Sequence, residues 1–269
     1  MSQLFMDREL ARRTERAEAA IGTSFIAVQD RLNPALGAAW RDFGGTYAFF
    51  VGAESPMTQT FGLGMFEPVT QDSLAAIEAF FSERGAPTMH EVSPLAGVDT
   101  FALLVARGYK PIELSSVLVM PLEERALPAS PLAVRVMEPA ERAAWVETSV
   151  AGWTDQAAYA AVIRELASVT SENPAMVHFL VERDGAPVGT GSLGIHGDVA
   201  LFAGASTIAS ARGLGSQALL LAARVTEARK RGCTLGLMAA EPGSISQRNA
   251  ERRGFRVAYT RTKWRREIA

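Results

Sequence analysis

RGLGSQ, at residues 212–217, is the most informative stretch of this chain. Residues 199–208 before it predict a strand, and the alanine- and leucine-rich residues 218–230 after it predict a helix. Glycines let a backbone approach a ligand closely, and the first N–H groups of a helix lie at the positive end of its dipole. Such an end suits phosphate oxygens. A strand, a basic glycine loop and a helix in this order therefore predict a cradle for a pyrophosphate.

Two common nucleotide-binding loops do not fit this stretch. A P-loop requires a lysine directly after its last glycine, and no lysine follows these glycines. A dinucleotide-binding loop opens a βαβ unit, whereas the strand before this loop continues an antiparallel meander and an arginine opens the loop. A plain strand-to-helix connection is the alternative to a ligand site, and the neighbouring elements weigh against it.

The predicted elements around the loop follow a definite order. Gly232 suits a left-handed cap and ends the helix, and Gly254-Phe255 ends a short helix that Ser246 is expected to cap. Upstream, we expect a first strand, two helices and two further strands. After the long helix, we expect a buried strand, the short helix and a last strand. The expected ranges are 134–136, 140–152, 155–171, 176–183, 187–194, 233–240, 246–253 and 256–264.

This order and the loop together resemble the cofactor-binding half of the GCN5-related N-acetyltransferases. The family pattern R-x-x-G-x-G/A is matched by Arg212 and Gly215, and Gln217 departs from it at the last place. The resemblance covers about residues 132–269. It implies an α/β (α+β) fold with a mixed, mostly antiparallel sheet flanked by helices, and acetyl-CoA as co-substrate.

The first half of the chain repeats this pattern in a diverged form. Gly85 and Gly108 are 23 residues apart, Gly232 and Gly254 are 22 apart, and Gly108 is followed by tyrosine where Gly254 is followed by phenylalanine. Chance similarity of two helix-strand-helix-strand patterns is the alternative. We expect two tandem units of the same fold: a diverged domain at 1–122, a linker at 123–131 and an acetyl-CoA-binding domain at 132–269.

The N-terminal unit also contains a Gly-Leu-Gly, at residues 62–64. We expect it inside a strand, before Glu67 and Pro68, and no arginine stands in that segment. The N-terminal unit is therefore expected not to bind acetyl-CoA. It is expected instead to form a wall of the substrate cleft or an interface.

Acetyl transfer makes three chemical demands on the site. The attacking amine must be neutral, the carbonyl oxygen that gains charge needs a donor, and the departing thiolate needs a proton or a dipole. The resemblance implies that the backbone N–H of Ile208 is the donor. It further implies these cofactor-binding residues: Thr207, Ile208, Arg212, Gly213, Leu214, Gly215, Ser216, Gln217, Ser246 and Asn249. A surface role for Arg212 and a capping role for Ser246 are the alternatives.

The residues that transfer protons are harder to assign. Many relatives carry a tyrosine four residues before the Gly-Phe pair, and this chain has Ala250 there. Tyr259 on the last strand is the substitute candidate for the general acid, with packing as the alternative. Glu241 and His196 are candidate bases, with a solvated turn as the alternative for His196. We expect no metal site.

Composition sets further limits. The chain has 269 residues, 48% of them hydrophobic, which is enough for a substantial core. The net charge of −2 gives no reason to expect nucleic acid or a membrane surface as a partner. The single cysteine, Cys233, forms no internal disulfide, no apolar run approaches the ~18 residues of a membrane span, and residues 1–8 lack the apolar core of a signal peptide. These features fit a cytoplasmic protein.

The sequence thus favours an acetyl-CoA-dependent N-acetyltransferase that acts on the primary amine of a small molecule. A non-catalytic acyl-CoA-binding regulator or partner protein is the alternative from another class, and Ala250 favours it. Acetylation of a protein lysine or N-terminus is a third hypothesis. The sequence does not identify the acceptor, and a homodimer stays open.

Overall fold

The computed structural model describes residues 4–153 and 160–268. The chain forms two compact units, the first made of Met1–Val119 with Ala239–Ala269 and the second of Met120–Met238. This division differs from the expected domains, because the last 31 residues belong with the N-terminal unit and not with the cofactor half. The reason is the pairing of the last strand, which is described below.

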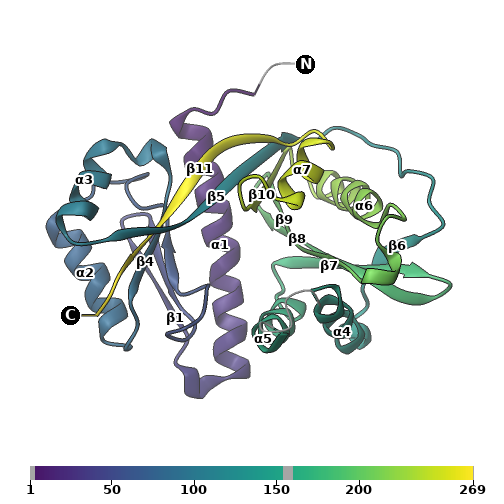
Figure 1. Cartoon of the computed structure of the whole chain (residues 1–269), viewed down its shortest axis with the longest axis horizontal. Coiled ribbons are helices and arrows are strands. Elements are labelled where there is room, and N and C mark those ends of the chain that lie inside the picture. The colour runs from purple at the N-terminus through teal and green to yellow at the C-terminus, as the bar shows by residue number, and fades with distance from the viewer. Residues whose placement is uncertain (1–3, 154–159, 269) are drawn as a thin grey trace. The chain divides into compact units, whose positions relative to one another are not determined.

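The first unit is built on a mixed sheet with the strand order β1-β2-β3-β4-β11-β5. Its neighbouring strands are antiparallel except β3 and β4, which are parallel at Thr60 and His90. Its strands are β1 (Ala39–Phe43), β2 (Thr46–Phe50), β3 (Gln59–Phe61), β4 (Thr88–Val92), β5 (Lys110–Pro121) and β11 (Arg256–Arg266). Figure 1 shows β11, in yellow, beside β5 and β4.

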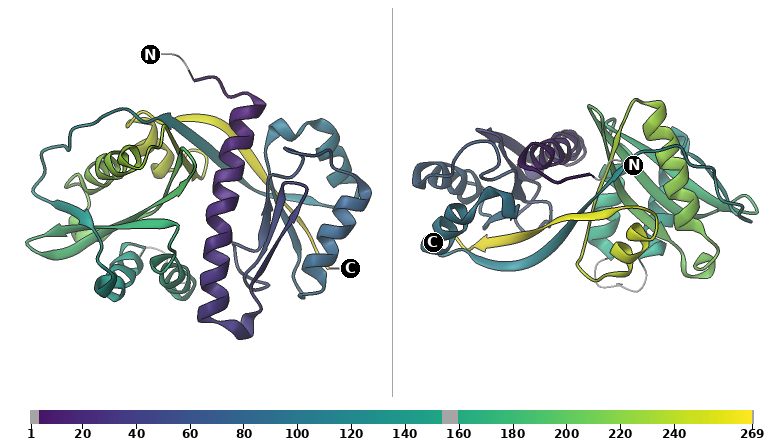
Figure 2. Two further views of the ribbon diagram at one scale, coloured as in Figure 1. Left: turned by 180° about the vertical axis from the view of Figure 1, so that it is seen from behind. Right: turned by 90° about the horizontal axis from the view of Figure 1, so that it is seen from above.

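Helices cover both faces of this sheet (Figure 2). Side chains alternate along a strand, so His90 and Glu91 of β4 face opposite sides. The face of His90 packs against α2 (Gln71–Ser82) and α3 (Val98–Ala106), in a core that includes Phe81, Leu104 and Trp264. The face of Glu91 lies toward the long helix α1 (Arg8–Leu32).

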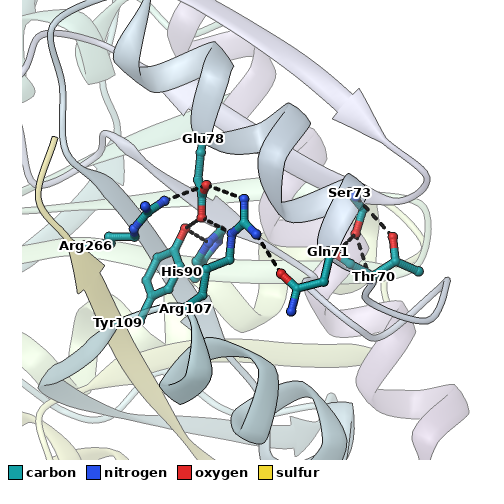
Figure 3. A network of polar contacts seen from close by, with 8 residues as sticks. All are labelled: Thr70, Gln71, Ser73, Glu78, His90, Arg107, Tyr109 and Arg266. Atoms are coloured by element: carbon teal, nitrogen blue, oxygen red, sulfur yellow. Dashed lines mark hydrogen bonds and ion pairs between the residues drawn. The ribbon is translucent and has the colours of Figure 1, made fainter. Parts of the chain in front are cut away.

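A polar network ties the end of β11 into the first unit (Figure 3). The Arg266 guanidinium lies 2.5 Å from the Glu78 carboxylate on α2, and Arg107 donates to both oxygens of the same carboxylate. The Tyr109 hydroxyl also donates to Glu78. Burial raises the pKa of Glu78, but these hydrogen bonds outweigh it and leave the pKa below its usual value.

The opposite face of the first unit holds a second anchor for β11. The Arg261 guanidinium is fully buried and lies 2.9, 2.7 and 3.7 Å from the carboxylates of Glu15, Glu18 and Glu91. Burial alone would lower the pKa of Arg261, but these carboxylates raise it well above its usual value. Burial also raises the pKa of Glu91 to about 7. Charge pairing across 170 or more residues of sequence therefore holds β11 in the first unit.

The strands of the second unit follow one another in the sheet in the order β10-β9-β8-β7-β6. Neighbouring strands are antiparallel except β9 with β10, which are parallel. The strands are β6 (Ala133–Val136), β7 (Met176–Arg183), β8 (Ala186–His196), β9 (Val199–Thr207) and β10 (Leu235–Ala240). Helices α4 (Arg142–Gly152) and α5 (Ala160–Ser171) cover one face and α6 (Ser216–Lys230) covers the other (Figure 1).

The expected fold class is therefore confirmed: two tandem units, each a mixed and mostly antiparallel sheet flanked by helices. Two local expectations need correction, and part of a third lies outside the described residues. The Gly-Leu-Gly at 62–64 lies in the turn after β3, not inside a strand. The short helix α7 (Ile245–Glu251) is capped by Ser244, which accepts from the Gln247 N–H, and not by Ser246. The helix expected over 155–171 is described only from Ala160, and residues 155–159 lie outside the described residues.

Within the described ranges, no helix is both long enough and apolar enough to cross a membrane.

Candidate functional site

The RGLGSQ stretch forms an exposed turn between β9 and α6 in the second unit. A short 3-10 turn, Ala209–Ala211, leads into it, and Gly215 is the N-cap of α6. Gly213 and Gly215 have φ angles of 81° and 88°, in the left-handed region that favours glycine. Nothing lies within 4 Å of the position where a Cβ would stand on either glycine. The turn therefore leaves open space beside its backbone.

A row of backbone donors lines this turn. The N–H groups of residues 213–217 have no hydrogen-bond acceptor among the described residues. The next two, of Ala218 and Leu219, donate to the Gly215 carbonyl, and no side chain caps the start of α6. Five successive N–H groups at a helix N-terminus form a site for an anion, because the helix dipole adds positive potential there.

Side chains of the predicted site brace this turn from behind. The Thr207 hydroxyl donates to the Ser216 hydroxyl at 3.0 Å and accepts from the Gln217 side-chain amide at 3.0 Å. Gln217, which departs from the family pattern, thus has a structural role. Arg212 donates to the carbonyls of Thr207 and Gly152, at 3.3 and 3.1 Å. These bonds fix the loop to the end of β9 and to the end of α4.

The amide that was expected to face a thioester is already bonded. The Ile208 N–H donates to the Val188 carbonyl at 3.0 Å, as part of the contact between β9 and β8. In this structure Ile208 therefore contributes to the sheet. A different backbone donor is offered by a bulge in β9, a few residues before Ile208.

β9 carries a bulge that the sequence analysis missed. Ser192 pairs with Ala203 and Thr190 pairs with Ser206, so one residue of β8 lies opposite two residues of β9. Gly204, in this bulge, is exposed and has a φ of 60°. A bulge leaves its extra residue out of the ladder. The signal for this bulge in the sequence was Gly204 itself, because an isolated glycine inside a strand pattern suggests a bulge.

One side of β9 is open along this same stretch. β10 pairs with β9 only over Val199, Ala200 and Leu201, whereas β9 continues to Thr207. In the second unit, the bulge and the end of β9 therefore have no partner strand on the β10 side. Unpaired strand edges offer N–H and C=O groups to an extended ligand.

Two buried side chains approach the bulge from opposite faces. On the α4 side, His178 Nδ1 lies 2.9 Å from the Ser192 hydroxyl, and burial lowers the pKa of His178 to about 4. On the α6 side, Arg224 donates to the carbonyls of Ser192 and Ala203, at 3.2 and 3.3 Å. Burial lowers the pKa of Arg224 to about 10. Neither residue was singled out from the sequence, because each stands in an otherwise apolar pattern.

The remaining predicted residues lie in other places. His196 is exposed at the β8–β9 turn of the second unit. Glu241, Ser246 and Asn249 belong to the first unit, where Glu241 and Ser246 are exposed. Tyr259 is also in the first unit. The structure thus brings Thr207 and residues 212–217 together in the second unit.

Tyr259, the candidate general acid, is buried on β11. Its hydroxyl donates to Glu15 at 2.7 Å and lies 3.3 Å from the Thr14 hydroxyl. Burial raises the pKa of Tyr259 well above its usual value. These contacts place the hydroxyl inside the ion cluster of the first unit rather than on its surface.

Comparison with known proteins gives matches of structure only. No family model and no curated protein matches the sequence. A GCN5-related N-acetyltransferase from Kribbella flavida is 18% identical, with a TM-score of 0.64 over 91% of this chain and 96% of that one. A tandem GNAT protein from the clavulanic acid biosynthesis pathway is 14% identical, with a TM-score of 0.60 over 94% and 95%. A GCN5-related N-acetyltransferase from Sphaerobacter thermophilus is 18% identical, with a TM-score of 0.57 over 86% and 76%.

Proposed function

Because the chain has the tandem fold of the GCN5-related N-acetyltransferases, we propose that it is an acetyl-CoA-dependent N-acetyltransferase with its cofactor site in the second unit. One observation carries this proposal: the five N–H groups of residues 213–217 at the start of α6, which have no acceptor among the described residues. They match the pyrophosphate of coenzyme A, which has several charged oxygens and needs several donors.

The surroundings of the loop fit the rest of acetyl-CoA. The two left-handed glycines leave room for the pyrophosphate, and the hub formed by Thr207, Ser216 and Gln217 fixes the loop before the ligand binds. The open edge of β9 offers backbone partners to the amide groups of the pantetheine arm, as a sheet edge does to an extended peptide. The reactive end of the arm would then lie toward the bulge.

Acetyl-CoA supplies the activated acetyl group, and the chain orients it. We assign the donor for the carbonyl oxygen to the backbone of the bulge at Gly204, in place of Ile208, whose N–H is bonded to Val188. A preorganised N–H aimed at an oxygen that gains charge is an effective contribution to acyl transfer. The exposed backbone at Gly204 makes this position accessible.

The acceptor in this proposal is a neutral primary amine of a small molecule. The amine must lose its extra proton before it attacks the thioester. The acceptor itself would be found by a screen of amines.

A non-catalytic acyl-CoA-binding protein is the second candidate. Ala250 stands where many relatives have a tyrosine, and the hydroxyl of Tyr259 is committed to the Glu15 cluster. Neither position therefore offers an exposed hydroxyl to the departing thiol. Acetyl-CoA binding without turnover of any amine would favour this candidate.

Calorimetric titration with acetyl-CoA tests the proposal. Gly215→Glu places a carboxylate at the N-terminus of α6 and should weaken binding by more than about 100-fold, through repulsion and lost space. Gly232→Glu is the matched control, because Gly232 has a φ of 85°, has equally open space, and lies just beyond the opposite end of the same helix. No binding to the unmutated protein, or equal loss in both variants, would overturn the proposal. Release of free thiol in an amine screen then separates enzyme from binding protein.

A further inference from the structure

Arg224 is a buried cation without an anion. It lies on α6 and is only 4% exposed, and among the described residues its guanidinium contacts backbone carbonyls and the Phe202 ring. No carboxylate of the described residues pairs with it. Arg261, which is also fully buried, has three carboxylates within 4 Å. The contrast sets Arg224 apart from an ordinary buried ion pair.

Such a group is unfavourable for folding. A charge removed from water without a partner loses its hydration, and carbonyl dipoles replace only part of it. Burial lowers the pKa of Arg224 to about 10, which leaves it charged at neutral pH. Costly features of this kind persist where a site uses them. The position of Arg224 therefore needs a functional explanation.

The guanidinium lies against the carbonyls that precede the bulge of β9. One nitrogen, Nη1, donates to Ser192 at 3.2 Å and to Ala203 at 3.3 Å, and these two residues are the last regular pair before the shift in register. Gly204, the next residue, is exposed. By holding both carbonyls toward α6, Arg224 fixes the peptide units that open the bulge.

The charge itself acts at the same place. In a poorly solvated interior, a positive charge that no carboxylate neutralises produces a field that extends over several ångströms. Gly191, opposite the bulge, has no side chain, and a Cβ there would come within 3.5 Å of the guanidinium carbon. The guanidinium therefore lies close to the β8 backbone opposite the bulge, beside the side chain of Leu220.

We propose that Arg224 is a positioning residue for acyl transfer: it holds the β9 bulge in the shape that presents a backbone N–H, and its charge stabilises negative charge on the reacting carbonyl oxygen. This inference rests on the proposed function. A purely structural tie between α6 and β9 is the competing explanation. The two differ in what the loss of the charge does to stability and to the bound thioester.

Two substitutions separate these explanations. Arg224→Met removes the charge and keeps an unbranched side chain of similar length, and Arg224→Gln removes the charge but keeps an amide donor for the carbonyls. If Arg224 is a positioning residue, both variants keep or raise the melting temperature and bind acetyl-CoA within about 3-fold of the unmutated protein. Turnover should fall on the order of 10- to 100-fold. Arg261→Met, the control for a paired arginine, should lower the melting temperature.

Infrared spectroscopy gives a readout that needs no acceptor. With acetyl-CoA labelled with ¹³C at the thioester carbonyl, the bound C=O stretch reports the local field, and it should lie at higher wavenumber in both variants than in the unmutated protein. An unchanged stretch and unchanged turnover in Arg224→Gln would overturn the inference, even where Arg224→Met fails to fold. If the unmutated protein still binds acetyl-CoA normally, that result overturns only the inference about Arg224 and leaves the proposed function standing. Absent binding would overturn the proposed function, and this inference with it.

Discussion

The two Gly-Leu-Gly turns, at residues 62–64 and 213–215, share a backbone conformation but not an environment. Both glycines of each turn have positive φ angles, 79° and 72° in the first unit and 81° and 88° in the second. A Cβ on Gly62 would lie 2.9 Å from the Gly45 carbonyl, and one on Gly64 would lie 2.8 Å from the Thr100 hydroxyl. A Cβ on Gly213 or Gly215 would have no atom within 4 Å. The glycine pattern sets the shape of a turn, and its surroundings determine whether a ligand fits.

The helices that follow the two turns differ in the same way. In the first unit, Thr70 caps α2 by accepting from the Ser73 N–H, and the Ser73 hydroxyl accepts from the Thr70 N–H. Glu67 also brings a negative charge into the connection. In the second unit, Gly215 begins α6 without any side-chain cap. Part of the donor set that an anion would use is therefore satisfied internally in the first unit.

The parallel strand pairs show a third contrast. In the first unit, the Thr60 hydroxyl lies 2.7 Å from His90 Nδ1 and bridges β3 to β4 next to the turn. In the second unit, β10 leaves β9 after Leu201. The first unit thus uses its own side chains where the second leaves backbone available, which supports the expectation that only the second binds acetyl-CoA.

Alanine substitutions in the two turns give the largest expected difference. Gly64→Ala adds a Cβ 2.8 Å from the Thr100 hydroxyl and 3.0 Å from the Ala96 methyl, in addition to left-handed strain. We expect it to lower the free energy of unfolding by about 2–4 kcal/mol. Gly213→Ala adds only the strain, about 1 kcal/mol. Urea unfolding followed by circular dichroism measures both.

Binding should show the reverse order of effects from stability, which makes the test sharper. Gly213→Ala should weaken acetyl-CoA binding, whereas Gly64→Ala, assayed where it is folded, should not. Equal destabilisation by the two substitutions would mean that the turns have similar surroundings, and the contrast between the units would fail.

Local patterns in the sequence were sufficient to predict the loop, and long-range contacts were not. The turn at 213–215 depends on glycines and on the adjacent helix start, so neighbouring residues determine it. The place of β11 depends on Arg261 meeting Glu15, 246 positions away, and no spacing rule encodes that distance. Tyr259 was read as a catalytic candidate for the same reason, because its partner Glu15 is equally remote. The bulge at Gly204 needed the register between β8 and β9, which a single strand does not contain.

Titration of His90 gives a smaller effect. Burial lowers the pKa of His90 to about 3, so the folded protein keeps this residue neutral while the unfolded chain binds a proton below about pH 6.5. A lowered histidine pKa therefore stabilises the fold above pH 6.5, and this contribution is lost as the pH falls toward 3. At pH 5 it should reduce the free energy of unfolding by about 2 kcal/mol relative to pH 7.

A difference measurement isolates His90 from its neighbours. Glu91, with a pKa raised to about 7, acts in the opposite sense between about pH 4.5 and 7. This term is common to the unmutated protein and to His90→Gln, so it cancels when the two are compared by urea unfolding. The difference in unfolding free energy between the two proteins should shrink by about 2 kcal/mol from pH 7 to pH 5. A constant difference would contradict a neutral His90 between β3 and β4.

Removal of the α2 cap gives the smallest effect and the cleanest comparison. Thr70→Ala deletes the acceptor for the Ser73 N–H and should cost about 1 kcal/mol of unfolding free energy, the usual contribution of an N-cap. The start of α2 would then resemble that of α6 in lacking a side-chain cap. If the cap were what keeps anions from the first unit, Thr70→Ala would acquire a second acetyl-CoA site in calorimetry. We expect the stoichiometry to stay unchanged, because the packed glycines at 62 and 64 and the carboxylate of Glu67 still exclude a pyrophosphate.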